Sequence, residues 1–222
     1  MKRKSETVSL NKISEEEIVY PRKISIELYN WVVPENEIFV KIEGVYEDRI
    51  FMIGVWCLER NEDRYHNEEP YSWCYRNFLS KSNLTDEESC IMEEFKMFLK
   101  ERGYPKIWYW KDDLNIWRGA EVRLSMDNLK CKWVDLSMIF LLEPVLVRGV
   151  FKLDLNEIAR VMYSNKMIRT VLYISEGKNV CDIYERFPEG WKHNDICEIE
   201  NCNKSFVSVV QEILGYLRRY HR

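Results

Sequence analysis

The sequence lacks the features of secreted, membrane-embedded and disulfide-stabilised proteins. None of its apolar stretches approaches the length needed to cross a bilayer, and no apolar run follows the basic residues at the N-terminus. The seven cysteines include no CxxC pair, and an odd number argues against a closed disulfide framework. We therefore expect an intracellular chain, cytoplasmic or nuclear, that is soluble, keeps its thiols reduced and has no membrane partner.

An excess of basic charge is also missing. The formal net charge is -4 and the isoelectric point is near 5.6, so the chain as a whole has no electrostatic footprint of a nucleic-acid-binding protein. Any contact with phosphates needs a local basic patch, and the sequence offers MKRK (1–4) and RRYHR (218–222). The first is more typical of a frayed tail, and the second is favoured by the dipole at a helix C-terminus in any case.

Motifs for zinc binding and for nucleophilic catalysis are scarce. His66, His193 and His221 have no Cys, Ser or Asp at motif spacing, so nucleophilic catalysis is not supported. Cys197 and Cys202, together with His193, offer three zinc ligands. Their spacing matches no standard zinc finger and a fourth ligand is not evident, so the sequence disfavours zinc there.

Aromatic and apolar residues, by contrast, are plentiful. Hydrophobic residues make up 46% of the chain, with 8 Trp and 13 Tyr among them, and this composition argues against disorder. A length of 222 residues is enough for one good-sized core. We expect an N-terminal tail and lead-in over 1–30 and one domain over 31–222.

Three adjacent strands are predicted in the first third of the chain. They cover EIFVKIEG (37–44), RIFMIGVWCLE (49–59) and YSWCYRNFL (71–79), with a polar turn between the first two. Short links between neighbouring strands favour an antiparallel meander. Side chains alternate across a strand, so Lys41 and Glu43 share one face, and two charges on an otherwise apolar strand need solvent, a partner or a site.

The first helix is marked at both ends. Thr85 and Glu88 form a capping-box pattern, and apolar residues recur at helical spacing until Gly103 and Pro105 stop the run. Behind it, KIWYW (106–110) is a short aromatic strand of the kind that follows a helix in a βαβ unit.

The second half of the chain is predicted to be mostly helical, although residues 164–200 show no clear pattern. We expect a helix over 112–124, a strand leading into a turn or helix over 130–140, a helix capped by Asp154 and Glu157, and an amphipathic helix over 204–222. The order of elements indicates an α/β protein with a mixed β-sheet, an antiparallel meander plus parallel strands, flanked by helices.

Five segments along the chain match, in order, the motifs of one protein family. IFVKIEG (38–44) is similar to a first strand that carries Asp-x-Glu, and RIFMIGV (49–55) is similar to the Ile-Gly-Val-like strand of the following hairpin. YWKDDL (109–114) stands in the place of a His-Trp-x-x-Ala-Glu-like motif. The most specific similarity covers 133–162, where an Asp and then Glu-Pro, Gly and Leu precede a helix. CNKSF (202–206) stands in the place of Tyr-Asn-x-x-Asp at the start of a helix.

From about Trp31 onward, the chain therefore resembles the RNase H-like superfamily. Within it, the similarity is to the YprB-type or RecB-associated group of predicted 3′–5′ exonucleases, a DEDD-like family found in bacteria and in large DNA viruses. The resemblance implies an RNase H-like fold. It also implies a site in which carboxylates hold two Mg²⁺ or Mn²⁺ ions about 3.5–4 Å apart, so that they activate water and stabilise the leaving oxygen.

The resemblance also indicates that this metal site is degenerate. Glu43 and Asp135 keep acids at positions of metal ligands, whereas Lys41, Leu114 and Phe206 stand where the family has acids. Lysine, leucine and phenylalanine supply no anionic oxygen. Because a cation replaces an anion at the centre, two more divalent ions nearby are disfavoured by electrostatics.

Alternatives remain open for each acid. Glu43 is either a ligand or the partner of Lys41, and Asp135 is either a ligand or the N-cap of the segment that follows. Asp113 is either a shifted substitute for the acid missing at 114 or, with Asp112, the start of a helix. An active nuclease would rely on Glu43, Asp113 and Asp135 and on one further acid, which is Asp195, Glu198 or Glu200.

Three functions are therefore weighed. The leading one is a nuclease-derived protein, catalytically degenerate, in which the ammonium of Lys41 replaces the lost cations and Phe206 packs beside it. Such a protein acts by binding single-stranded or duplex nucleic acid, or a replication or repair protein, and needs no cofactor. The alternatives are an active Mg²⁺- or Mn²⁺-dependent 3′–5′ exonuclease and a structural or interaction module. The aromatic run 107–110 is either core or a surface that stacks bases.

Overall fold

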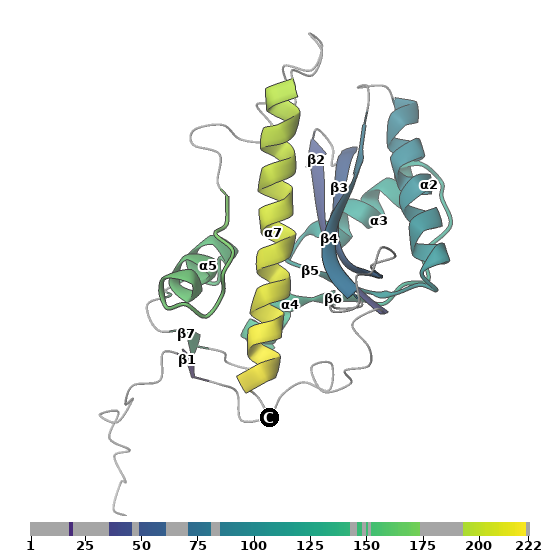
Figure 1. Cartoon of the computed structure of the whole chain (residues 1–222). Coiled ribbons are helices and arrows are strands. Elements are labelled where there is room, and N and C mark those ends of the chain that lie inside the picture. Colours follow the sequence, from purple (N-terminus) through teal and green to yellow (C-terminus); the bar gives the residue numbers. More distant parts are fainter. Residues whose placement is uncertain are drawn as a thin grey trace, which may run out of the picture.

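The computed structural model of the chain (Figure 1) describes residues 18–19, 36–45, 49–60, 71–80, 85–142, 146–147, 150, 152–173 and 193–220. Some residues singled out from the sequence lie outside these ranges, namely the basic segment 1–4, Trp31, His66 and His221. Among the described residues, no helix is long and apolar enough to cross a membrane.

The centre of the fold is a five-stranded mixed sheet with the strand order β4-β3-β2-β5-β6. β2 (Glu37–Val45), β3 (Arg49–Arg60) and β4 (Tyr71–Leu79) form an antiparallel meander. β5 (Lys106–Tyr109) and β6 (Trp133–Asp135) add to it in parallel. The predicted α/β class, the meander and the mixed sheet are therefore confirmed.

Helices cover both faces of this sheet (Figure 1). On one face lie α2 (Thr85–Glu101) and α3 (Asp113–Arg123). On the other lies the long α7 (His193–Tyr220), together with α4 (Leu136–Leu142) and α5 (Leu155–Ser164). A sheet that is apolar on both faces has to be covered in this way, and each face has its own core.

The alternation of side chains along β2 divides these two cores. Ile38, Val40 and Ile42 are at most 1% exposed and pack under α2 and α3. Phe39 points the other way and joins the core under α7 and α5. By the same period of two, Lys41 faces α7, so the charge noted in the sequence lies inside a helix-covered layer and not on a free edge.

One helix boundary and one capping interaction differ from those predicted. The last helix begins at His193 and not at Lys204, so CNKSF lies in the middle of a helix and not at its start. The apolar stripe is hidden there because a polar residue, Asn203, takes a fully buried position. In α2 the carboxylate of Glu88 does not serve the helix start, because its Oε1 accepts from the Ile50 amide of β3 at 2.7 Å.

Other predicted elements are found close to their expected ends. The carboxylate of Asp154 accepts from the Asn156 amide at 2.8 Å and caps α5, as predicted.

A two-residue strand that was not predicted lies within the expected N-terminal tail. This strand, β1 (Ile18–Val19), pairs antiparallel with β7 (Leu146–Val147). This pairing ties that part of the tail to the segment after α4.

Candidate functional site

The candidate site lies between the sheet and α7, around the side chain of Lys41. Its Nζ lies 3.1 Å from Asp113 Oδ1 and 3.1 Å from the carbonyl oxygen of Ile42, to both of which it donates. The ring of Phe206, from α7, covers the ammonium with its centroid 5.1 Å from Nζ. A cation held between a carboxylate and an aromatic face is thus present where the strand pattern predicted a charged pair.

Asp113 reaches this place because β5 stops early. The pairing of β2 with β5 ends at Phe39 and Trp108, and the chain then turns into α3. The Ile42 amide of β2 lies beyond that pairing and donates to Asp113 Oδ1 at 2.8 Å. The Asp113 residue is 1% exposed, and within the described part of the chain its Oδ2 has no hydrogen-bond partner.

Asn203 connects α7 to two strands of the meander. Its Nδ2 donates to Glu43 Oε1 at 3.2 Å and to the Lys41 carbonyl at 3.3 Å. Its Oδ1 accepts from the Tyr75 hydroxyl of β4 at 3.2 Å. One fully buried amide therefore bridges β2, β4 and α7. We call the set of Lys41, Glu43, Tyr75, Asp113, Asn203 and Phe206 the Lys41 cluster.

Gly54 of β3 makes room for this amide. It pairs with Lys41 on one side and with Asn77 on the other, in the middle of the sheet. A Cβ placed on Gly54 would lie 1.5 Å from Asn203 Oδ1. The glycine of the Ile-Gly-Val segment thus permits a close approach of α7, which is a common reason for glycine inside a strand.

The charges of the Lys41 cluster determine its protonation. Burial alone lowers the pKa of Lys41, but the charges of Asp113 and Glu43 outweigh it and hold that pKa above its ordinary value. Burial raises the pKa of the Glu43 and Asp113 carboxyls, although the charge of Lys41 acts to lower both, and the charge of Asp113 raises the pKa of Glu43 further. Burial and the charges of Glu200 and Glu43 raise the pKa of Tyr75, so its hydroxyl stays a donor to Asn203.

Asp135 has another role in the structure. Its Oδ1 accepts from the Ser137 amide at 2.8 Å, which caps α4, and from the Lys111 amide at 3.0 Å. In the described ranges, Glu43, Asp113 and Asp135 do not bring their ligand oxygens within 4.8 Å of one another. Leu114, at the first turn of α3, is half-buried beside Asp113.

These residues do not fit a pair of divalent metal ions. The ammonium of Lys41 already occupies hydrogen-bonding positions next to Asp113, and the Asn203 amide donates to Glu43. Two dications would have to enter beside a fixed cation and replace these donors. We therefore derive no metal-dependent step for this site.

The further acids and the candidate zinc ligands lie on the first half of α7. Glu200 accepts from Asn77 Nδ2 at 2.6 Å, which ties it to β4, and Asp195 is in the first turn. Cys197 and Cys202 are five residues apart, so they lie about 140° apart around the helix. Neither they nor Glu198 belong to a three-ligand group of described residues.

The aromatic run 107–110 and Arg218, both suggested for nucleic-acid contact, are held inside the fold or by a buried partner. The aromatic run 107–110 is at most 8% exposed, so these rings are core and present no face to a base. Arg218, in the basic segment at the end of α7, has Nη2 3.1 Å from both oxygens of the buried Glu37. This guanidinium is therefore committed to the fold.

Sequence reasoning missed one residue of the Lys41 cluster and one group of side chains elsewhere on the sheet. Asn203 stands in the place of the Asn of Tyr-Asn-x-x-Asp, but only acidic residues were considered as candidate site residues in that segment. Cys57 and Cys74 face each other across β3 and β4, and with Glu59 they form the single three-ligand group found among the described residues. Only the register of β3 and β4 reveals this group, because it places Cys57 of the Cys-x-Glu segment opposite Cys74.

No protein-family model matches the chain, and no curated protein matches it in sequence. The resemblance to RNase H-like exonucleases therefore depends on the motifs and on the order of the strands.

Proposed function

We propose that the chain is a nuclease-derived, RNase H-like protein that acts in nucleic-acid metabolism by binding rather than by cleavage. An antiparallel meander followed by parallel strands, with helices on both faces, supports the fold part of this proposal. The motif order of the sequence supports the family part. Fold alone decides no function, so the argument depends on the site.

The observation that carries the proposal is the contact between Lys41 Nζ and Asp113 Oδ1 at 3.1 Å. In the family pattern, the position of Lys41 supplies an acidic metal ligand. Here it supplies the cation itself, held by an acid from the neighbouring helix and covered by Phe206. The ammonium offsets part of the negative charge of the carboxyls around it, and it takes up the ligand positions that metal-dependent catalysis needs to keep open.

The binding target that we propose is single-stranded or duplex nucleic acid. The support for this target is the resemblance itself, because nucleases of this kind bind a nucleic-acid strand as well as cleave it, and loss of the metal ligands removes the cleavage. A replication or repair protein as the target is the other outcome of the tests below.

Metal binding and cleavage separate a degenerate site from an active one. We would titrate the purified chain with Mn²⁺ by calorimetry and assay degradation of a single-stranded oligonucleotide in the same buffer. We expect neither saturable binding nor cleavage, and we expect Lys41→Asp, which restores Asp-x-Glu, to gain Mn²⁺ binding. Saturable binding in the unmodified chain, with cleavage that disappears in Glu43→Ala, would instead establish the active exonuclease.

Nucleic-acid binding is tested separately, without metal. Fluorescence anisotropy with labelled single-stranded and duplex DNA and RNA should give saturable binding that weakens as salt rises, because phosphate contacts release counterions. If no oligonucleotide binds at low salt, the proposal fails and an interaction module becomes the better description.

A further inference from the structure

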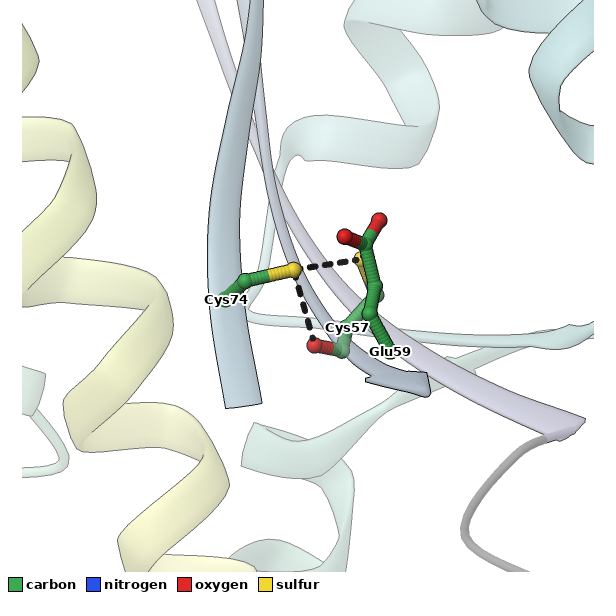
Figure 2. A group of neighbouring side chains, drawn as sticks. All are labelled: Cys57, Glu59 and Cys74. Carbon is green, nitrogen blue, oxygen red and sulfur yellow. Dashed lines mark hydrogen bonds between the residues drawn. The ribbon is translucent and has the colours of Figure 1, made fainter. Parts of the chain in front are cut away.

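A second cluster of reactive side chains lies on the opposite face of the sheet, under α2. Cys57 of β3 and Cys74 of β4 are directly paired across the two strands, and their sulfur atoms are 3.8 Å apart (Figure 2). Glu59 follows two residues after Cys57 and therefore shares its face, with Oε1 3.8 Å from Cys57 Sγ. We call Cys57, Glu59 and Cys74 the thiol site.

The spacing of these three groups is that of ligands around a tetrahedral cation. Zinc binds thiolate sulfur at about 2.3 Å and carboxylate oxygen at about 2.0–2.2 Å. At a tetrahedral angle, these bond lengths place two sulfur atoms about 3.8 Å apart, and a sulfur and an oxygen about 3.6 Å apart. The structure has 3.8 Å between the two sulfur atoms and 3.8 Å between Cys57 Sγ and Glu59 Oε1, and the ligand atoms of all three residues lie within 4.8 Å of one another. A cation can therefore enter between the three groups without a shift of either strand.

The surroundings of the thiol site supply compensating charge. Two thiolates and a carboxylate carry three negative charges, of which a divalent cation cancels two. Arg76 Nε and Arg102 Nη2 lie 2.5 and 2.8 Å from Glu59 Oε1, so positive charge is already present for the remainder. Both guanidinium groups contact the same oxygen, Oε1, so the acceptor positions of the second carboxylate oxygen of Glu59 provide the capacity for a cation.

The thiol site is also open on one side. Cys57 is fully buried and fixes one ligand in the sheet, whereas Cys74 is half-buried and the Glu59 side chain is 26% exposed. An ion can thus reach the site from solvent. Three protein ligands leave one coordination position of a tetrahedral cation for water.

We propose that Cys57, Cys74 and Glu59 bind one thiophilic divalent cation of the zinc class, with water as the fourth ligand. Two thiolates select zinc over magnesium, since hard cations prefer oxygen ligands. The proposal is independent of the function proposed above, because the thiol site and the Lys41 cluster lie on opposite faces of the sheet and share no residue.

Cobalt is the probe for this site, because Co²⁺ occupies zinc sites and its thiolate complexes absorb light. The full chain, purified under reducing conditions without metal, is titrated with Co²⁺. We expect one equivalent to give a thiolate-to-cobalt absorption band that Zn²⁺ removes and an excess of Mg²⁺ does not. Because a thiol has to lose its proton to bind a cation, binding should release protons and weaken as pH falls.

Matched variants assign the ligands. Cys74→Ser should abolish the band, whereas Cys90→Ser, at an exposed cysteine of α2, should leave it unchanged. Glu59→Gln keeps both thiols and should weaken binding about 10- to 100-fold or more, given that even outer-shell partners are worth that much. Circular dichroism checks that each variant is folded.

Four results would overturn the proposal. The first is a chain that gives no band, and the second is a band that persists in Cys74→Ser. The third is a chain isolated without reductant in which peptide mapping finds Cys57 joined to Cys74, which would make the pair a disulfide and not a cation site. Unchanged affinity in Glu59→Gln would likewise remove Glu59 and, with it, the three-ligand set.

Discussion

The side-chain oxygen of Asn203 occupies the space that a Cβ on Gly54 would need, since the two positions are 1.5 Å apart. Helix α7 therefore contacts the sheet at Gly54 through a buried amide. The same amide holds Glu43 and Tyr75, so the close approach and the polar bonds depend on each other.

Gly54→Ala should destabilise the fold by about 1–3 kcal/mol, because the added methyl group overpacks the interface and displaces Asn203 from its partners. Urea unfolding followed by circular dichroism measures this loss. The control is Gly119→Ala in α3, where a Cβ meets nothing within 4 Å and alanine should stabilise the helix by about 0.5–1 kcal/mol. Equal effects of the two substitutions would contradict the close approach.

Asp113→Asn should cost about 3–5 kcal/mol, since it leaves the partly buried ammonium of Lys41 without its carboxylate. Asp112→Asn changes the exposed neighbour, whose side chain makes no capping bond, and should stay within about 0.5 kcal/mol of the unmodified chain. Lys41→Met in the Asp113→Asn background should recover part of the loss. A double-mutant cycle in urea measures this coupling, and additive effects would show that the pair does not interact.

Glu43→Gln should change how stability depends on pH. Burial raises the pKa of Glu43 above the 4.5 of the unfolded chain, so the folded state binds more protons and loses stability as pH rises through the interval above 4.5. The amide variant lacks this titration. The unfolding free energy of Glu43→Gln minus that of the unmodified chain should therefore increase from pH 4.5 upward and then level off. A difference that decreases over that interval would mean that the folded pKa is lowered.

Asp135 offers a test of capping against metal binding. Asp135→Ala should lose about 1 kcal/mol, whereas Asp135→Asn should be nearly neutral, because asparagine caps helices as well as aspartate does. Thermal or urea unfolding without added metal measures both. If Asn and Ala were equally damaging, the carboxylate charge would matter for a reason other than the cap of α4.

The strands were predictable because their periodicity is local. Side-chain alternation placed Lys41 and Glu43 on one face, and short links between strands gave the meander, so both could be read from the sequence. The partner of Lys41 could not, because Asp113 is 72 residues away and meets it only through the turn between β5 and α3. Local patterns favoured Glu43 as the partner, whereas the bonded carboxylate is Asp113.

The start of α7 was missed for a related reason. A buried asparagine is polar, so it interrupts the apolar stripe that reveals an amphipathic helix. The pairing of Cys57 with Cys74 was missed because ten residues separate β3 from β4, and a link of that length does not fix the register of the two strands in the sequence. The local sequence thus predicts each helix or strand, whereas tertiary contacts determine which residues meet in the Lys41 cluster and in the thiol site.

Helix α7 also has a consequence for how the chain folds as it is made. Its bonds to β2 join residues 160 positions apart at Asn203 and Glu43, and 181 apart at Arg218 and Glu37. During synthesis, the meander leaves the ribosome long before α7, with one face of its sheet uncovered. Contacts of such high sequence separation form slowly, so this face is the one that a chaperone or a neighbouring nascent chain meets first.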